Sequence, residues 1–296
     1  MTPEHPMIAC VERAVQFIQN ELQEDRAPTL DNVAIASGMS KFHFHRIYKL
    51  ISGETCRETI TRLRMAKGAA LLEEFGTSIT EAALAAGYAS SQAFAKAIKR
   101  ELSTSASALR SDPERLSNTV RTLLEPSQTI TKQEFPPMRI EICSLDPLEV
   151  VLVRTKDKFP DLAETYWKLV EAAGEPQNIS GILGLPHRDI STFEDDDFIF
   201  DCAIISSRAV ECFLPNMKHD SIAPGTYLLV RHKGLDIDLP HTLDALYAVV
   251  LTQPDIQLAD APCVHHYIDD PEEVDEIECR TDIYMKIDML EEWNIR

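Results

Sequence analysis

The fold is decided by residues 29–102, which read "TLDNVAIASGMSKFHFHRIYKLISG" (29–53), "TCRETITRLRMAKGAALLEEF" (55–75) and "SITEAALAAGYASSQAFAKAIKREL" (78–102). The two outer strings carry the same signals in the same order. Each has a hydroxyl residue that caps an amphipathic helix, a Gly in a turn, a second Ser cap and a basic helix. The middle string has the pattern of one long helix. The stretch therefore predicts two helix-turn-helix units joined by a connector helix.

The first helix-turn-helix unit begins at Thr29, which caps a helix, turns at Gly38 and is capped again by Ser40. Apolar spacing predicts buried faces on both helices: Leu30, Val33, Ala34 and Ile35 on the first, and Phe42, Ile47, Tyr48 and Leu50 on the second. The other residues of the second helix form a polar and basic face: Lys41, His43, His45, Arg46 and Lys49. Such a face is typical of a helix that reads a DNA major groove.

The second unit repeats this order, with a cap at Thr80, a turn at Gly87 and a cap at Ser90. Its first helix is expected to pack through Ala82, Ala83 and Leu84. Phe94 and Ile98, four residues apart, are the expected core anchors of its second helix. The polar face of that helix carries Gln92, Lys96, Lys99 and Arg100.

The connector helix sets the distance between the two reading helices. A helix of about 20 residues is roughly 30 Å long, and successive major grooves on one face of B-DNA lie about 34 Å apart. One chain can therefore place two reading helices in adjacent grooves. The same helix carries basic residues that we expect near the DNA phosphates: Arg57, Arg62, Arg64 and Lys67.

This region resembles the AraC/XylS family of bacterial transcription regulators in "IASGMSKFHFHRIYKLISGE", "RLRMAKGAALL", "ITEAALAAGYASSQAFAKAIKRE" and the closing Arg110. The resemblance covers about 80 residues in the family's own order. It implies an all-α DNA-binding domain, double-stranded DNA as partner and RNA polymerase as a candidate partner. By position, it implies that the base-reading residues are Phe42, His45, Arg46, Ser91, Gln92 and Lys96.

One segment departs from the family pattern. Where such proteins usually have a Gly and a Ser-Pro pair, this chain has Ser103, Thr104, Ser105 and Ala106. We therefore expect the second reading helix to be docked less firmly than the first.

Length and charge support two domains. A chain of 296 residues can form two hydrophobic cores. Residues 1–125 carry 15 Lys and Arg against 15 Asp and Glu, whereas residues 126–296 carry 14 against 33, so the whole net charge of −19 lies in the second part. An acidic second domain weakens nonspecific attachment to DNA, because phosphate attraction is the sequence-independent part of binding.

The chain carries no signal peptide pattern and no apolar run near the roughly 18 residues that a membrane span needs. We expect a cytoplasmic protein that does not bind membranes. The seven scattered Cys residues, with no CxxC pair, are expected to be reduced.

Periodicity then places the domain boundaries. Residues 7–25 and 112–124 are expected to add a first and a last helix, which makes a seven-helix domain over residues 1–124. Pro126, Pro136 and Pro137 mark residues 125–137 as the linker. Residues 138–296 contain an alternating segment at 139–156, read as two strands about a turn at Asp146-Pro147, strand-like segments at 198–206, 225–234 and 279–288, and helices at 159–174 and 238–253. This pattern predicts an α+β second domain.

A weak internal repeat lies in the second domain. "LVRTKDKFPDLAETYWKLV" (152–170) and "LVRHKGLDIDLPHTLDALYAVV" (229–250) share Leu-Val-Arg, a Lys two residues later and a helix that opens with a Pro. A strand-helix unit used twice about a pseudo-twofold axis predicts a curved antiparallel sheet with a cleft between its halves.

The second domain resembles the gyrase-inhibitor-like (GyrI-like) effector-binding domain in "APGTYLLVRHKG", "DAPCVHHYIDDPEEV" and "TDIYMKID". The resemblance implies that a small-molecule effector binds between the two repeats, among aromatic side chains. The implied effector-binding residues are Tyr166, Trp167, Tyr227, Tyr247, His265 and Tyr267. His265 stands where the family usually has a Glu, so the usual partner of a cationic ligand is missing, and so is the carboxylate that hydrolytic members need.

The sequence thus predicts a DNA-binding transcription regulator with a small-molecule sensor, without catalytic residues, metal or cofactor. We expect its operator to be asymmetric because its two reading helices differ. One alternative is a protein whose second domain binds or hydrolyses xenobiotics. Another is a regulator whose acidic domain contacts protein. Cys263, His265 and His266 suggest a metal site only weakly, because neighbouring residues of a strand point to opposite faces.

Overall fold

The computed structural model describes residues 6–125, 135, 138–155, 162–174, 176–187, 199–211, 216–253 and 255–289. The chain splits into two compact units. One unit contains Met1–Met39 and Ile47–Lys132, and the other contains Ser40–Arg46 and Gln133–Arg296. The expected linker lies outside the described residues except for Glu125 and Phe135.

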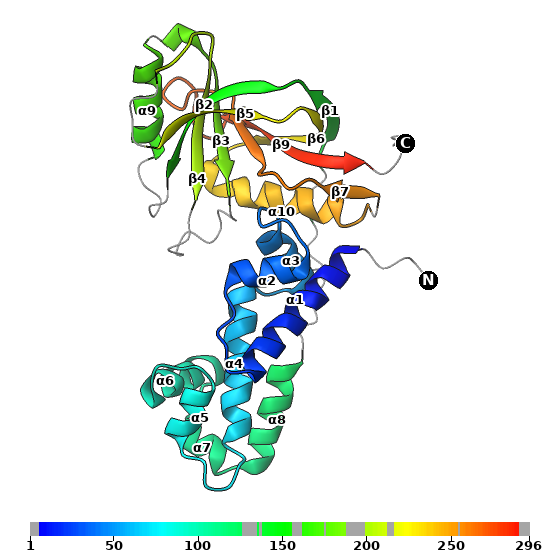
Figure 1. Cartoon of the computed structure of the whole chain (residues 1–296), viewed down its shortest axis with the longest axis vertical. Coiled ribbons are helices and arrows are strands. Elements are labelled where there is room, and N and C mark those ends of the chain that lie inside the picture. Colours follow the sequence, from blue (N-terminus) through cyan, green and yellow to red (C-terminus); the bar gives the residue numbers. More distant parts are fainter. Residues whose placement is uncertain are drawn as a thin grey trace. The chain divides into compact units, whose positions relative to one another are not determined.

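Residues 6–125 form eight helices, labelled in Figure 1. They are α1 (Pro6–Gln23), α2 (Leu30–Ser37), α3 (Phe44–Ser52), α4 (Cys56–Leu71), α5 (Ile79–Ala85), α6 (Ser91–Leu102), α7 (Ala106–Arg110) and α8 (Pro113–Leu124). The pairs α2–α3 and α5–α6 are the two expected helix-turn-helix units, and α4 is the connector. The expectation of seven helices was wrong because α7, with five residues, is too short to show a periodicity.

Side-chain caps begin these helices where the sequence has hydroxyl residues. Thr29 accepts a hydrogen bond from the backbone N–H of Asn32, and Ser90 accepts one from Ala93 at 3.1 Å. The cap of α5 is Ser78, not the expected Thr80, because Ser78 and Glu81 form a capping box. Both turns use the left-handed backbone that Gly tolerates, with φ of 73° at Gly38 and 77° at Gly87.

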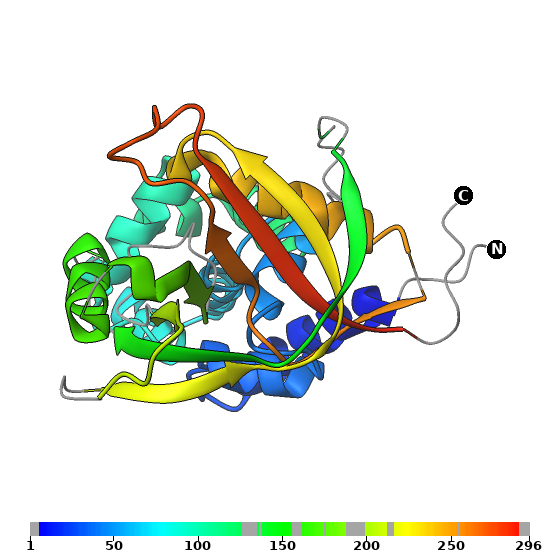
Figure 2. The same cartoon turned by 90° about the horizontal axis from the view of Figure 1, so that it is seen from above.

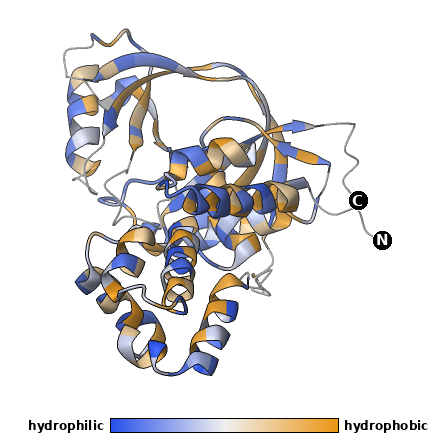
Figure 3. Ribbon diagram, turned by 60° about the horizontal axis from the view of Figure 1, so that its bottom comes forward, coloured by the Kyte–Doolittle hydropathy of each residue, from blue (hydrophilic) through white to orange (hydrophobic). Residues whose placement is uncertain are grey.

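The second helix-turn-helix unit packs on α4 around a shared apolar core. Met65, Ala66 and Ala69 of α4 lie in one buried cluster with Phe94 and Ile98 of α6. Figure 3 shows hydrophilic and hydrophobic residues on the same helical ribbons of this unit. Two residues expected to pack are exposed instead, since 77% of Ile35 and 55% of Leu84 is accessible. Both lie on short helices, whose buried face the sequence does not define.

The connector is shorter than expected. α4 has 16 residues, so its length is roughly 24 Å at about 1.5 Å per residue. The expected 30 Å included residues 72–75, which lie beyond the end of α4.

The segment that departs from the family pattern forms a regular connection. Ser103 ends α6 in the left-handed conformation, with φ of 52°, and Ser105 caps α7 through the N–H of Ala108 at 3.1 Å. Phe94 and Ile98 have no accessible surface. α6 is thus anchored in the core by fully buried side chains, as α3 is by Phe44 and Tyr48, and looser docking of α6 than of α3 stays a prediction.

Ser103→Gly is expected to raise the free energy of unfolding by about 1 kcal/mol, because Gly removes the cost of a side chain at positive φ. Ser105→Ala is the matched control: losing the cap is expected to cost about 1 kcal/mol. Urea unfolding followed by far-UV circular dichroism measures both changes. A Ser103→Gly protein no more stable than wild type contradicts the prediction.

The second unit is built on one antiparallel sheet, seen from above in Figure 2. Its strands are β1 (Ile140–Leu145), β2 (Leu148–Thr155), β3 (Ile179–Pro186), β4 (Phe200–Ser206), β5 (Met217–Ile222), β6 (Gly225–Lys233), β7 (Ile256–Leu258), β8 (Val264–Tyr267) and β9 (Arg280–Met289). Its helices are α9 (Leu162–Ala173), α10 (Leu239–Val250) and the short 3-10 helices η1 (Pro176–Asn178) and η3 (Asp236–Asp238). The fold is α+β, as expected.

The strand order repeats outward from the central pair β3–β8. It runs β3-β4-β2-β5 to one edge and β8-β9-β6-β1 to the other, with β7 paired to β9. α9 follows β2 in the chain, and α10 follows β6. Two similar halves thus meet at β3 and β8, which agrees with the internal repeat in the sequence.

The repeat also contains the same ion pair twice. Arg154 of β2 lies opposite Asp201 of β4 and binds both of its carboxylate oxygens at 2.7 Å. Arg231 of β6 lies opposite Asp282 of β9 and binds both oxygens at 2.6 Å. The shared Leu-Val-Arg strings therefore supply, in each half, one ion pair between a partly exposed arginine and a buried aspartate.

α9 and α10 cover the same face of the sheet. Tyr166 of α9 lies against Tyr267 of β8, with ring centroids 6.1 Å apart, and Thr242 of α10 bonds His232 of β6 at 2.8 Å. Thr281 of β9 pairs with both His232 and Tyr267, so these side chains share one face. The opposite face carries an apolar cluster that includes Val150, Leu152, Leu183, Tyr227 and Val264.

Candidate functional site

The second reading helix, α6, presents the expected polar residues to solvent. Ser91 is the first residue of α6, directly after the cap Ser90. Gln92 and Lys96 are exposed and lie four residues apart on one side of α6, while Phe94 and Ile98 are buried on another. The helix therefore has a buried anchor and a free polar face, as groove reading requires.

The first reading helix begins in the segment Ser40–Arg46, which groups with the second unit. Phe42 lies in the turn before α3, and His45 and Arg46 lie in its first turn. Arg46 donates to the backbone oxygen of Pro240 at 3.0 Å and pairs with Asp244. His43 and Arg46 are thus buried, although the sequence places them on an exposed face.

Two connector residues expected at DNA phosphates have partners inside the chain. Arg62 pairs with Glu54 at 2.6 Å and also donates to the backbone oxygen of Glu125 at 3.1 Å. Arg64 donates to the backbone oxygens of Ala86 at 3.0 Å and Gly87. These contacts support a structural role, because Arg64 ties α4 to the turn of the second helix-turn-helix unit. Their carbonyl partners are not visible in a sequence pattern.

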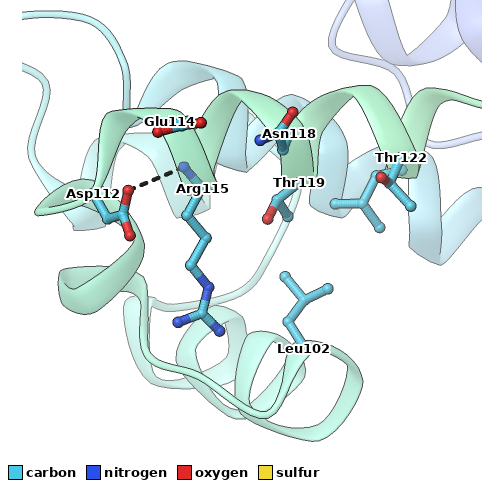
Figure 4. Close-up of a pocket in the computed structure, with 8 residues that line it drawn as sticks. Leu102, Asp112, Glu114, Arg115, Asn118, Thr119 and Thr122 are labelled. Atoms are coloured by element: carbon cyan, nitrogen blue, oxygen red, sulfur yellow. Dashed lines mark hydrogen bonds between the residues drawn. The ribbon is translucent and has the colours of Figure 1, made fainter.

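A hollow of about 440 Å³ lies beside α8 (Figure 4). It is lined by residues of both polar and apolar character and includes none of those expected to bind DNA or effector: Leu102, Asp112, Glu114, Arg115, Asn118, Thr119, Thr122 and Leu123. Asp112 caps α8 through the N–H of Arg115 at 3.1 Å.

Four of the six expected effector-binding residues lie on the helix-covered face of the sheet. His265 and Tyr267 are two residues apart on β8, Tyr166 of α9 contacts Tyr267, and the Tyr247 hydroxyl of α10 lies 3.8 Å from the thiol of Cys263. The structure therefore brings residues from both halves of the repeat to one face.

Two expected residues are elsewhere. Tyr227 lies on the opposite face, and its hydroxyl donates to the backbone oxygen of Ala223 at 2.6 Å. Trp167 is 59% exposed on α9. Strand register and helix orientation therefore separate Tyr227 and Trp167 from the other four residues, and their part in effector binding stays a prediction.

His265 is the central residue of the remaining set. It is 1% exposed, it lies opposite Gly184 of β3, and its Nε2 atom has no hydrogen-bond partner in the described part of the chain. Burial lowers the pKa of His265 to about 3. Burial also raises the pKa of Tyr267 above its usual range. His265 and Tyr267 are therefore uncharged at neutral pH.

The neighbouring histidine does not join this site. His266 pairs with Asp282, while His265 pairs with Ile283, so the two imidazoles point to opposite faces. In the described ranges, no group of three or more His, Cys, Asp and Glu side chains is placed to hold a metal ion. Among the same residues, no helix has the length and apolar character of a membrane span.

Together, the two helix-turn-helix units and the repeated sheet define a DNA-binding protein with a separate ligand-binding domain. Residues 138–288 match the GyrI-like small molecule binding domain, and residues 33–112 match a helix-turn-helix domain. The chain belongs to the GyrI-like family and carries an AraC-type helix-turn-helix region before that domain.

Curated relatives agree with this assignment. The chain is 30% identical to the probable transcription factor PqrA of Proteus vulgaris over 96 residues, which cover 32% of this chain and 79% of that protein. It is 22% identical to the transcriptional regulator Rob of Salmonella typhimurium over 239 residues, which cover 77% of this chain and 80% of that protein. The chain is a DNA-binding transcription regulator with a small-molecule-binding domain.

The sheet domain is also similar to the solved structure of a Listeria innocua hydrolase. The identity is 12%, the TM-score is 0.39, and the match covers 52% of this chain and 93% of that one. This likeness carries no argument about activity.

Proposed function

We propose that the chain reads an asymmetric DNA operator through α3 and α6 and responds to a small molecule bound on the helix-covered face of the sheet. The proposal of DNA reading rests on the two faces of α6. Gln92 and Lys96 are exposed on one face, while Phe94 holds the helix in the core on the other. Phe42, His45 and Arg46 supply the first reading surface, and Ser91 borders the second.

The two reading helices differ in sequence, so the operator is asymmetric, with two boxes about one DNA turn apart. In this proposal Arg46 gives up Asp244 and Pro240 when it binds DNA. Arg62 and Arg64 act by holding the fold around α4. RNA polymerase is a proposed partner on the promoter, and the cytoplasm is the proposed compartment.

Arg46→Ala is expected to weaken specific operator binding by about 1–3 kcal/mol and to relax base preference in the first box only. Gln92→Ala is the matched variant for the second box. Selection of bound duplexes from a random library, at two salt concentrations, measures both effects. Unchanged affinity and base preference in Arg46→Ala overturns its assignment, and a motif with one box overturns the two-helix proposal.

We further propose three segments: residues 1–124 bind DNA, residues 125–137 link, and residues 138–296 bind the effector. In the effector segment, the central residues support binding rather than catalysis. His265 is buried and uncharged, and its neighbour Tyr267 is un-ionised. Incubation of the full chain with candidate effectors, followed by recovery of unchanged compound, tests this. If the wild type converts a compound and the His265→Leu protein does not, the proposal that this segment only binds its effector is contradicted.

A further inference from the structure

An unpaired nitrogen lies at the centre of the second domain. His265 is 1% exposed, and its Nε2 atom has no hydrogen-bond partner among the described residues. Buried polar atoms in folded proteins are nearly always hydrogen-bonded, so an exception needs an explanation. A ligand that bonds Nε2 provides one.

The surroundings of this nitrogen come from both halves of the repeat. His265 lies opposite Gly184 where β8 meets β3, and Gly184 lies opposite Cys202 of β4. A Cβ atom at Gly184 would be 2.6 Å from the ring of Phe200 and 2.9 Å from the hydroxyl of Tyr267. The glycine thus lets two aromatic side chains converge beside His265.

These aromatic side chains indicate how a ligand is accommodated. Since Phe200 and Tyr267 fill the space over Gly184, a ligand enters by displacing a ring. An aromatic ligand restores the ring contact that is lost, and the neighbouring Tyr166 adds a further ring, 6.1 Å from that of Tyr267.

Charge limits the ligand further. Burial lowers the pKa of His265 to about 3 and raises the pKa of Cys202 to about 12. Burial also raises the pKa of Tyr166 and Tyr267 above the usual range. All four groups are therefore uncharged at neutral pH. A charged ligand would lose its water here without gaining an opposite charge from these four groups. The charges that act on the site from further away, Arg46 on His265 and Asp236 on Tyr267, have opposite signs and so favour neither a cation nor an anion.

We infer that the site at His265 takes an uncharged aromatic molecule with a hydroxyl group, and that this hydroxyl bonds Nε2. The inference rests on the proposed effector role of this face. A hydroxyl fits either tautomer of a neutral imidazole, because it donates to a bare nitrogen and accepts from an N–H. Neither an ammonium nor a carboxylate matches both tautomers.

The test is isothermal titration of the full-length protein with four probes that share the naphthalene ring system: 2-naphthol, naphthalene, 2-naphthoate and 2-naphthyltrimethylammonium. The wild type is expected to bind 2-naphthol at least tenfold more tightly than the other three. His265→Leu is expected to bind 2-naphthol and naphthalene equally. His265→Glu is expected to prefer the ammonium probe. His266→Leu, on the opposite face, is the control that keeps the wild-type order.

Operator binding is measured on the same samples, so that failure of the ligand inference is distinguished from failure of the proposed DNA-binding function. If the wild type binds the ammonium or the carboxylate probe more tightly than 2-naphthol, the inferred ligand class is overturned, while the proposed effector role of this face is kept. Operator binding without binding of any probe overturns the inference alone. If the His265→Leu protein still prefers 2-naphthol over naphthalene, the hydroxyl does not bond Nε2 of His265, and the inference is overturned.

Discussion

Phe94→Ala is expected to lower the free energy of unfolding of the DNA-binding part by about 3–5 kcal/mol, the usual cost of removing a buried aromatic side chain. Phe94 has no accessible surface, and its ring lies 5.1 Å from that of Tyr88. Because Phe94 anchors α6, we expect binding to the second operator box to fail while the first box is still bound. Urea unfolding and binding to duplexes with one or both boxes measure the two effects.

Gly68 of α4 provides a specific test of that contact. Gly→Ala inside a helix ordinarily stabilises by about 1 kcal/mol. Here an added Cβ would lie 2.7 Å from the Phe94 ring, so Gly68→Ala is expected to destabilise. Combining it with Phe94→Leu is expected to restore part of the loss. Stabilisation by Gly68→Ala alone, or equal loss at both boxes in Phe94→Ala, contradicts this account of α6.

Much of the DNA-binding half could be predicted from the sequence because its signals are local. Thr29 and Ser90 cap helices of the two helix-turn-helix units, Gly38 and Gly87 lie in their turns, and each acts within a few residues of itself. Burial on short helices was less predictable. A helix of seven residues, such as α5, makes about two turns, so the sequence does not show that Leu84 is exposed.

The second domain depends on contacts between residues far apart in the chain. The strands with alternating apolar residues were predicted, but β3, with Gly181, Gly184 and Pro186, lacks a strand pattern. The importance of Gly184 appears only when the register sets it opposite His265, beside rings from β4 and β8. The same information decides that Tyr227 lies on the other face.

Asp201→Ala is expected to lower the free energy of unfolding of the second domain by roughly 2–4 kcal/mol. Asp201 is 3% exposed and accepts hydrogen bonds from Arg154 and from His187, the latter at 2.7 Å. Removing it leaves both donors without their partner. The expected loss is smaller than for a fully buried pair, because the side chain of Arg154 is 37% exposed and can reach water.

Both tryptophans, Trp167 and Trp293, lie in the second half of the chain, so tryptophan fluorescence during urea unfolding reports on this domain. Asp282→Ala is the matched variant in the other half of the repeat. Its partner Arg231 is 55% exposed, so we expect a smaller loss there. Equal losses at Asp201 and Asp282 contradict the role assigned to burial of the arginine.

The Asp201 contact also predicts a dependence on pH. Burial alone raises the pKa of Asp201, but hydrogen bonds from Arg154 and His187 outweigh it and lower the pKa to about 2, below the usual 3.8. A carboxylate with a lowered pKa stabilises the fold above its unfolded pKa and loses that effect as pH falls through its folded pKa. The contribution, about 2 kcal/mol, is therefore present above about pH 4 and is lost between about pH 4 and pH 2.

Wild type and Asp201→Asn should accordingly become more similar in stability as the pH falls through this window. A stability difference that stays constant down to about pH 2 means that the charge of Asp201 does not stabilise the domain.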